Sequence, residues 1–443
     1  MSGPKAKLLA LAAAVALMTG LPVRAFAMDV GANKAAVDRI LDVEYPHLDA
    51  LYKDIHQHPE LGHHEVRTST LLAKEMRDLG YEVTEHVGGT GVVAILHNGA
   101  GPTVMIRTEL DALPMQEKTG LPYASTVQTD YDGKTTYVDH SCGHDIHMAA
   151  WVGTAKTLVE LKSRWHGTVM FIAQPAEEDV DGAAGMIRDG LFTRFKKPDY
   201  GFALHDGPFE YGYINYKAGV FSSNSDSLDI TFHGRGGHGA KPQQTIDPVL
   251  MASRFVVDVQ AIVSRERDPL QMGVISIGAI QGGSAGNIIP DTVTLRGTIR
   301  SYDAKVRARM LDGVRRVAAA EAAMSGAPAP DVTIVDGGKS VVNDKALTER
   351  TAPVFKAAFG DKAVELEYPN TASEDYSEFI LAGVPSVFFG IGVYSPERVA
   401  AAKAGGPPLP SNHSPEFAPV PEPTIRTGVE AMSLAVMNVL GAA

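Results

Sequence analysis

The sequence predicts an α/β protein in which a second, smaller domain of the ferredoxin-like βαββαβ type is inserted into the first. One observation is that short apolar runs alternate with helical patterns before residue 217 and again after residue 336. Another is that the segment between them carries six elements in the order strand, helix, strand, strand, helix, strand. We therefore expect residues 28–219 and 337–443 to form the larger domain and residues 220–336 to form the inserted one.

The first 27 residues have the pattern of a cleavable export signal. Lys5 and Lys7 precede eleven residues, 8–18, that are rich in Leu and Ala, and Ala25-Phe26-Ala27 has the small-x-small pattern of a cleavage site. This apolar run is too short to span a bilayer about 30 Å thick, which disfavours the alternative of an uncleaved membrane anchor. We expect residues 1–27 to be a signal peptide and the mature protein to be periplasmic or secreted, with no membrane contact.

The larger domain is expected to start with two helices and to continue as a sheet with helical connections. Imperfect helical patterns cover residues 36–53 and 65–79, and Gly80 follows as a C-cap. The other predicted helices cover residues 148–161, 346–359 and 424–440, and the predicted strands cover residues 91–96, 103–108, 168–173, 200–204 and 384–390. Residues 400–410, rich in Ala, Gly and Pro, indicate a surface loop.

The inserted domain is predicted because the order of predicted strands and helices changes after residue 217. Its strands are expected at residues 227–232, 272–280, 292–299 and 332–335, and its helices at residues 248–263 and 306–324. This order is the split βαβ arrangement, which is complete as a small domain.

Composition limits the classes of function. The chain has 443 residues, of which 44% are apolar, and 40 basic residues against 52 acidic ones give a net charge of −12. It contains no basic block, so we expect no nucleic-acid partner. A single cysteine excludes an intrachain disulfide, and an idle thiol would be an oxidation risk in an exported protein.

That cysteine lies in a histidine cluster, His-Ser-Cys-Gly-His-Asp-Ile-His, at residues 140–147. On an extended segment, Cys142 and His144 would point the same way and could share a metal, and metal binding protects a thiolate from stray oxidation. Two alternatives remain open: a buried structural cysteine beside solvated histidines, and a Cys–His nucleophilic pair. The second is weakened because the two residues are so close in the chain that one cannot readily act as base for the other.

Further candidate groups follow predicted strands, which is where α/β sheets carry their chemistry. Glu177 and Glu178 come after the strand at 168–173, so one carboxylate could bind a metal while the other acts as general base toward the bound water. His205 ends the strand at 200–204, and His413 lies in a polar turn. Each of these two histidines is a weak signal alone, but a dinuclear site needs about that many further donors.

Seven motifs occur in family order from about residue 36 to 440 and together resemble the M20 metallopeptidases. The motifs are His-Pro-Glu-Leu at 58–61, Asp-Ala-Leu-Pro at 111–114, His-Ser-Cys-Gly-His-Asp at 140–145, Gln-Pro-Ala-Glu-Glu at 174–178, Gly-Gly-His-Gly-Ala-Lys-Pro at 236–242, Gly-Asn-Ile-Ile-Pro-Asp at 286–291 and Leu-Arg-Gly-Thr-Ile-Arg at 295–300. The chain is most similar to the amidohydrolase branch, subfamily D, which includes hippurate hydrolases and auxin-conjugate hydrolases. This resemblance implies a metal-bearing catalytic α/β domain interrupted by a βαββαβ lid through which such enzymes form homodimers.

The resemblance also implies the roles of individual residues. It makes Glu177 the catalytic base, His238 an oxyanion donor that reaches the partner subunit's site, and Asn287 a binder of the substrate carboxylate. The implied ligands of two divalent metal ions are Cys142, His144, Glu178, His205 and His413. A ligand set with one thiolate and otherwise nitrogen and oxygen donors does not identify the metal as zinc, manganese or cobalt.

The chain departs from the family pattern next to the expected metals. The usual Arg-Ala-Asp-x-Asp is replaced by residues 107–111, in which Glu109 is one methylene longer than the usual aspartate, so the roles of Glu109 and Asp111 stay open. The usual His-Ala-Cys-Gly-His is replaced by His-Ser-Cys-Gly-His at 140–144.

The expected function is therefore an exported metal-dependent amidohydrolase that cleaves N-acyl or N-aroyl amino acids or related small conjugates. A dipeptidase or carboxypeptidase with the same metals is the alternative within the enzymes. A catalytically silent periplasmic binding protein and a metal-storage protein are the alternatives outside them. Both are disfavoured because Glu177 is intact, and a protein that only binds has no need of a base beside a ligand carboxylate.

Overall fold

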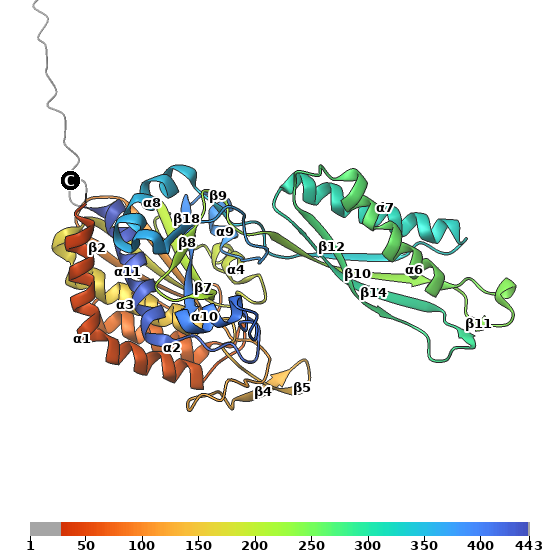
Figure 1. Cartoon of the computed structure of the whole chain (residues 1–443), viewed down its shortest axis with the longest axis horizontal. Helices are drawn as coiled ribbons and strands as arrows, with labels where there is room; N and C mark the ends of the chain where they lie inside the picture. Colours follow the sequence, from red (N-terminus) through yellow and green to blue (C-terminus); the bar gives the residue numbers. More distant parts are fainter. Residues whose placement is uncertain (1–27, 442–443) are drawn as a thin grey trace, which may run out of the picture.

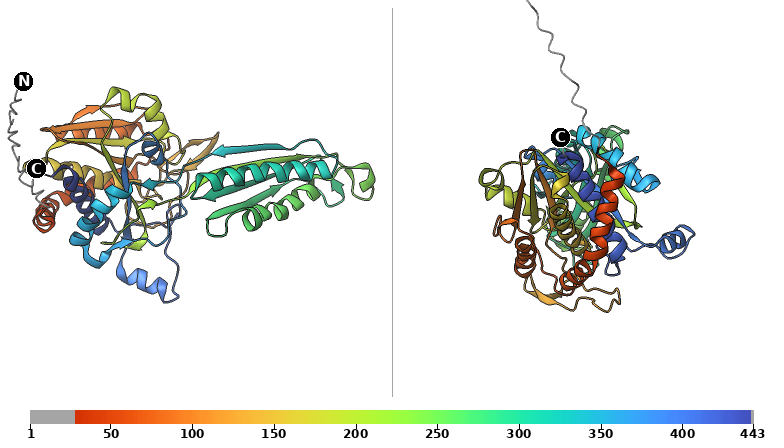
Figure 2. Two further views of the ribbon diagram at one scale, coloured as in Figure 1. Left: turned by 90° about the horizontal axis from the view of Figure 1, so that it is seen from above. Right: turned by 90° about the vertical axis from the view of Figure 1, so that its left-hand side faces the viewer.

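The computed structural model describes residues 28–441, and the predicted signal peptide, residues 1–27, lies outside them. A larger α/β domain carries a long inserted domain, called the lid below, that projects from one side (Figures 1 and 2). This arrangement confirms the predicted fold class. The domain boundaries at residues 219 and 336 stay a prediction, but the chain leaves and re-enters the larger domain through the paired short strands β9 (Gly219–Val220) and β16 (Val342–Asn343).

The larger domain is built on an eight-stranded sheet with the order β1-β2-β6-β3-β7-β18-β8-β17. β3 runs parallel to β6 and β7, and β7 runs parallel to β18, so the carboxyl ends of these strands meet at one edge. The strands are β1 (Glu82–Thr84), β2 (Val92–Asn98), β3 (Thr103–Glu109), β6 (Gly167–Gln174), β7 (Tyr200–Glu210), β8 (Ile214–Tyr216), β17 (Ala363–Glu365) and β18 (Ser386–Tyr394).

Helices cover both faces of this sheet. One face packs against α1 (Val30–Gln57), α2 (Val66–Asp78), α3 (His144–Glu160), α8 (Lys345–Phe359) and α11 (Pro421–Leu440), which contribute most of the main core. The opposite face packs against the shorter α4 (Gly182–Arg188), α5 (Leu191–Arg194) and α9 (Ser377–Leu381). The central strands are consequently buried on both faces, as the continuous apolar run in β18 indicates.

The lid has the predicted βαββαβ order and an antiparallel sheet with the order β12-β14-β10-β15. Both of its helices pack on one face of this sheet around a separate apolar core. The elements are β10 (Asn224–His233), α6 (Pro248–Asp258), β12 (Gly273–Gln281), β14 (Thr292–Ser301), α7 (Ala304–Met324) and β15 (Asp331–Asp336). At its far tip, β11 (Gly237–His238) pairs with β13 (Ile288–Ile289) (Figure 1).

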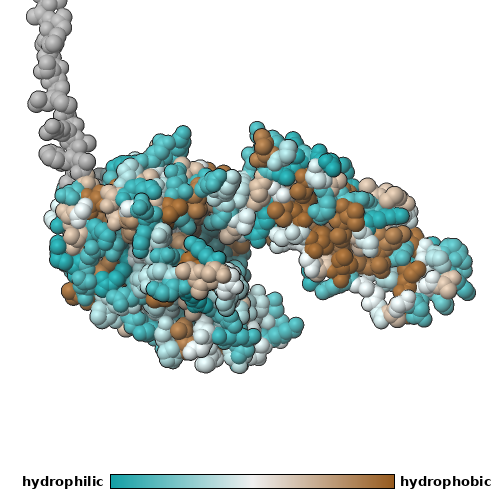
Figure 3. Space-filling model, viewed as in Figure 1, coloured by the Kyte–Doolittle hydropathy of each residue, from teal (hydrophilic) through white to brown (hydrophobic). Residues whose placement is uncertain are grey.

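Apolar side chains are exposed on the lid, where Figure 3 shows them gathered in a patch. Those that the structure exposes there are Val249, Leu250, Val257, Leu270, Val274, Ile280, Ile288, Met324 and Val335. An exposed apolar surface of this kind marks a contact region in many soluble proteins. No helix in residues 28–441 is long and apolar enough to cross a membrane.

The structure corrects several predicted boundaries. The helix expected at 148–161 begins at His144, because Gly143 at φ 86° turns the chain directly into it, so Cys142 and His144 do not share an extended segment. The strand expected to end at residue 204 continues to Glu210. The helix expected at 248–263 ends at Asp258 and is followed by a π-helical turn, η3 (Ile262–Glu266), and the loop expected at 400–410 overlaps α10 (Pro396–Lys403).

Short elements were missed because too few residues carry their pattern. Besides the short strands and helices already given, they are the exposed hairpin of β4 (Gln128–Tyr131) and β5 (Lys134–Tyr137), and the 3-10 turns η1 (Lys162–Arg164), η2 (Pro242–Gln244) and η4 (Gly360–Lys362).

Candidate metal centre and active site

The first two candidate ligands are placed by a tight turn before α3. Gly143 lies between them with a positive φ of 86°, and a Cβ there would collide with the Asp206 carboxylate. The turn leaves Cys142 facing the end of β7 and starts the helix at His144. Glycine is therefore required at this position both for the backbone conformation and for the close approach.

The five predicted ligands lie together as two overlapping groups. The ligand atoms of Cys142, His144 and His205 are all within 4.8 Å of one another, and those of Cys142, Glu178 and His413 form a second such group. The Cys142 Sγ lies 3.4 Å from His205 Nε2, and His413 Nε2 lies 3.2 Å from Glu178 Oε1. Because Cys142 belongs to both groups, its thiolate could bridge two cations.

Backbone carbonyl groups orient two of the histidines. The Nδ1 of His144 lies 2.8 Å from the Asp111 carbonyl oxygen, and the Nδ1 of His205 lies 2.7 Å from the Asp206 carbonyl oxygen. A carbonyl oxygen can only accept, so each Nδ1 carries the proton and each Nε2 is left with a lone pair. This is the usual arrangement of metal-binding histidines.

The buried polar atoms of the site fit bound cations. His144 Nε2 and Glu178 Oε1 are buried without a hydrogen-bond partner, although both are strong polar groups. Buried groups of this kind are normally satisfied, and a cation in each of the two groups would satisfy both atoms. One thiolate, three imidazoles and one carboxylate make a donor set that suits a pair of divalent transition metals.

Glu177 lies beside these groups but in neither of them. Its Oε2 is 3.9 Å from His144 Nε2, and the residue is 7% exposed. Burial and the neighbouring Glu374 and Glu178 carboxylates raise its pKa well above the ordinary value. A raised pKa suits a carboxylate that accepts a proton near neutral pH.

Burial and the carboxylates of Glu178 and Glu177 also raise the pKa of the Cys142 thiol well above its ordinary value. A bound cation reverses this effect, because a thiol that coordinates a metal is deprotonated. Cys142 therefore carries its thiolate charge only when metal is bound.

A buried network that the sequence did not predict supports the site from behind. Arg107 donates from Nη2 to Glu374 Oε1 at 2.8 Å and from Nε to Gln174 Oε1 at 2.8 Å, and it also pairs with Glu109. The Nδ1 of His147 lies 3.0 Å from Glu109 Oε2, and its Nε2 accepts a hydrogen bond from the Asp206 backbone N–H at 2.9 Å.

This network gives Glu109 a position, because its carboxylate pairs with Arg107 through Oε1 and with His147 through Oε2. Asp111 contacts the ligands themselves, since its Oδ2 accepts a hydrogen bond from the Glu178 backbone N–H at 2.8 Å. Arg107, Glu109, Gln174 and His147 all lie in segments that the sequence analysis singled out, but nothing in the sequence indicated that they meet. Glu374 lies in an irregular segment without any periodic pattern.

The site opens into a cavity of ≈ 760 Å³ between the larger domain and the base of the lid. Its only arginine or lysine is Arg300, near the end of β14, whose Nη1 lies 3.4 Å from the Thr371 carbonyl oxygen. Apolar rings of Phe221 and Phe388 line it too. The residues of the two ligand groups on its wall are Cys142, Glu178, His205 and His413, together with the base Glu177.

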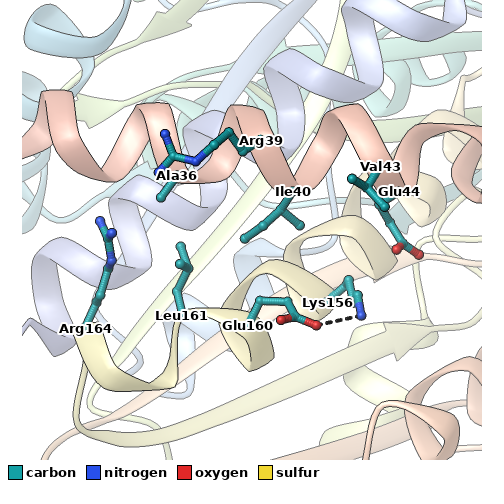
Figure 4. Close-up of a pocket in the computed structure, with 9 residues that line it drawn as sticks. All are labelled: Ala36, Arg39, Ile40, Val43, Glu44, Lys156, Glu160, Leu161 and Arg164. Atoms are coloured by element: carbon teal, nitrogen blue, oxygen red, sulfur yellow. Dashed lines mark hydrogen bonds and ion pairs between the residues drawn. The ribbon is translucent and has the colours of Figure 1, made fainter.

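A second hollow, of ≈ 430 Å³, lies on the helical side of the larger domain between α1 and α3 (Figure 4). It is lined by Ile40 and Leu161 and by charged side chains, two of which, Lys156 and Glu160, form an ion pair at 2.7 Å. It contains none of the predicted site residues, so the chemistry belongs to the first cavity.

His238 and Asn287 lie elsewhere, at the exposed tip of the lid. The two are neighbours: the Gly239 N–H donates to the Asn287 carbonyl oxygen at 2.8 Å, next to the β11–β13 pair. Neither residue lines the cavity that contains Glu177. Within a single chain, the structure therefore brings these two residues together but not with the metal ligands.

Comparison with known proteins relates the chain to one family of peptidases and amidohydrolases. The family model described as "Peptidase family M20/M25/M40" matches residues 105–406. Hippurate hydrolase from Campylobacter jejuni is 38% identical over 77% of this chain and 87% of its own length. N-acetyl-L-cysteine deacetylase from Bacillus subtilis is 35% identical over 77% of this chain and 80% of its length.

Two further relatives bear on the chemistry. Thermostable carboxypeptidase 1 from Saccharolobus solfataricus is 35% identical over 86% of this chain and 92% of its length. The crystal structure of the Bacillus subtilis YXEP protein, described as a dinuclear metal binding peptidase from the M20 family, has a TM-score of 0.72 and 28% identity. That match covers 92% of this chain and 99% of the other.

Proposed function

This chain belongs to peptidase family M20/M25/M40 and is a metal-dependent amidohydrolase of the N-acyl amino acid type, and from that premise we propose its mechanism, substrate and place of action. It is exported, and it hydrolyses the amide bond of N-acyl or N-aroyl amino acids with two divalent cations and Glu177 as general base. The observation that carries this proposal is the position of Cys142 in two groups of ligands that share one cavity with Glu177.

The chemistry follows from the positions of the side chains. Two divalent cations held by Cys142, His144, Glu178, His205 and His413 would lower the pKa of a water molecule and polarise the scissile carbonyl group. Glu177 accepts the proton from the attacking water and then delivers it to the leaving amine. Its raised pKa supports the second step, in which the carboxylic acid must act as a donor.

The cavity also supports a substrate with a free carboxylate. Arg300 is the only basic side chain on its wall, and the single polar contact of its guanidinium group in the described residues is a long one to Thr371. A guanidinium group can bind a carboxylate through two parallel hydrogen bonds. The rings of Phe221 and Phe388 suit an apolar acyl group.

A carboxypeptidase or dipeptidase is the second candidate, since one relative has a carboxypeptidase name and peptides also end in a carboxylate. A silent binding protein is disfavoured because Glu177 is present and lies 3.9 Å from His144, a position that a protein that only binds would not need to keep.

The lid supports a homodimer. It exposes an apolar patch, and it carries His238 and Asn287 at a tip that is remote from the cavity of its own chain. In a two-fold dimer formed through the lids, His238 would reach the partner's cavity and stabilise the oxyanion of the transition state, and Asn287 would bind the substrate carboxylate there.

The division of labour between the two carboxylates is tested by a matched pair of variants. Glu177→Gln is expected to keep both metal ions and the fold but to lose at least about 10²-fold in kcat, as expected for removal of a general base. Glu178→Gln is expected to lose metal. Metal analysis beside kinetics measures both, and loss of metal from the Glu177 variant alone would reverse the two roles.

A further inference from the structure

A further group of potential ligands lies in the larger domain, apart from the two groups that share Cys142. It consists of His56 near the end of α1, Glu117 in the loop after β3, and Asp139 just after β5, and their ligand atoms are all within 4.8 Å of one another. His56 and Asp139 are each 2% exposed, and the Glu117 side chain is fully buried. No step of the proposed mechanism uses these residues.

The imidazole of His56 is oriented like that of a metal ligand. Its Nδ1 lies 2.6 Å from Asp145 Oδ2, which is close enough for the ring to donate this proton to the carboxylate. Its Nε2 is turned toward Glu117 Oε2 at 3.3 Å but lacks the geometry of a hydrogen bond, so it is buried without a partner. Metal-binding histidines typically donate the other ring N–H to a carboxylate in this way.

The carboxylates of Asp145, Glu117 and Asp139 surround His56, and in the described residues only the imidazole itself pairs with them as a basic group. Burial lowers the pKa of His56, but the carboxylates of Asp145 and Glu117 outweigh this and raise it to about 10. Thr119 and the Ser125 backbone N–H donate to Glu117, and the Ile146 backbone N–H donates to Asp145. The nearby ammonium group of Lys53 is instead paired with Asp49, at 2.5 Å. One imidazolium cannot balance three buried carboxylates, so burying this group with no further cation would be costly.

Next to this group, the hydroxyl of Tyr52 is also buried without a hydrogen-bond partner. The centre of the Tyr52 ring lies 5.7 Å from the centre of the His56 ring, and the centre of the Tyr123 ring lies 5.3 Å from it. The group is thus enclosed by protein and holds more than one unsatisfied polar atom, as expected around an ion rather than around a dry core.

We propose that His56 Nε2, Glu117 and Asp139 bind a third divalent cation with a structural role. One imidazole nitrogen and two carboxylate oxygens suit Zn²⁺ or Mn²⁺. The ion connects the end of α1 to the loop after β3 and to the segment that carries Cys142 and His144. Successive residues of a helix point about 100° apart, so His144 can face the catalytic cations while Asp145 supports His56.

The direct test is to crystallise the full chain with saturating Mn²⁺ and to measure anomalous scattering at the manganese edge. Three peaks per chain are expected, one of them between His56 Nε2, Glu117 and Asp139. Two peaks at the Cys142 groups with none beside His56 would overturn the proposal, whether or not the enzyme cleaves N-acyl amino acids.

Metal counting gives an independent test in solution. After removal of free Mn²⁺, the wild type should retain three ions per chain, His56→Gln two, and the control variant His58→Gln three, because His58 is half exposed and contacts only Asp54. The double variant Cys142→Ser, His413→Ala should still retain the ion beside His56. An equal number of retained ions in the wild type and the His56 variant would contradict the proposal. If that variant fails to fold, the anomalous map of the wild type tests the proposal alone.

Discussion

At the scale of single residues, Cys142 is the centre of the site. It is the chain's only cysteine, it is 6% exposed, and it belongs to both ligand groups. Without metal, burial and two carboxylates keep its thiol protonated. With metal, the thiolate is shielded, because its lone pairs are used in coordination.

Alkylation of Cys142 should therefore depend on metal. We expect iodoacetamide to leave the metal-loaded enzyme unmodified and active. After chelation it should modify Cys142 at a rate that keeps increasing with pH until the pH is well above the usual pKa of a cysteine thiol. Mass spectrometry of the two forms measures this. Restoring metal to unalkylated protein should restore activity. Rapid alkylation of the active, metal-loaded enzyme with matching inactivation would instead indicate a nucleophilic cysteine.

Sequence reasoning was effective for residues that carry distinctive chemistry and ineffective for those that support them. The candidate ligands could be named from the sequence because the cysteine lies in a histidine cluster and because the paired carboxylates and His205 follow apolar strands. The structure brings their ligand atoms together, and metal binding by them stays a prediction. Arg107 and Glu374 were missed because they lie 267 positions apart in the chain and meet only in the folded domain. His56 was missed because a histidine in an amphipathic helix has no local signal of its role.

At the scale of elements, the start of α3 positions one candidate ligand, His144, and one residue of the supporting network, His147. The helix was predicted to begin at residue 148, where apolar periodicity begins, but Gly143 begins it at His144 and thereby places His144 and His147 in its first turn. Apolar periodicity could not show this, because His144, Asp145 and His147 in the first turn are buried against polar partners. Long helices and central strands were predicted well, whereas elements of two to four residues were not.

Gly143→Ala should lower both stability and metal affinity. A left-handed conformation costs a residue with a Cβ roughly 1–2 kcal/mol, and the new methyl group would also displace the Asp206 carboxylate from its place below Cys142. Thermal unfolding and competition with a chelator measure the two effects.

Gly80→Ala is the matched control for this variant, since Gly80 has φ 85° but open space around it. Gly80→Ala should lower the free energy of unfolding by a similar amount, because its alanine must adopt the same left-handed conformation. It should leave the affinity for metal unchanged. Equal metal affinity in the two variants would show that the turn does not position the ligands.

At the scale of the whole molecule, the lid separates His238 and Asn287 from the cavity of their own chain. β11, which contains His238, lies at the end of the lid that is far from the larger domain (Figure 1), whereas the cavity with Glu177 lies between the larger domain and the base of the lid. The βαββαβ order of the lid could be predicted from the sequence. The distance between its tip and the cavity could not, because it depends on how the two connecting segments orient the lid.

Mixed dimers test the contribution of the partner. Subunits with Glu177→Gln and subunits with His238→Ala should each be nearly inactive alone, with unchanged dimer mass. In a heterodimer, one of the two composite sites combines an intact base with an intact donor, so part of the activity should return. Heterodimers of verified composition that remain inactive would show that His238 does not serve the neighbouring site.

The central claim is that the whole molecule cleaves N-acyl amino acids by metal-assisted hydrolysis. The most direct measurement is kcat/KM of the metal-loaded mature enzyme for N-benzoylglycine, N-acetyl amino acids and dipeptides in parallel. The cavity, with one guanidinium group and two aromatic rings, predicts that an N-acyl or N-aroyl amino acid is preferred over any dipeptide by at least about tenfold, the smaller end of what one pocket contact discriminates. Preference for dipeptides, or no turnover of any of these compounds by protein with both catalytic metal ions bound, would contradict it.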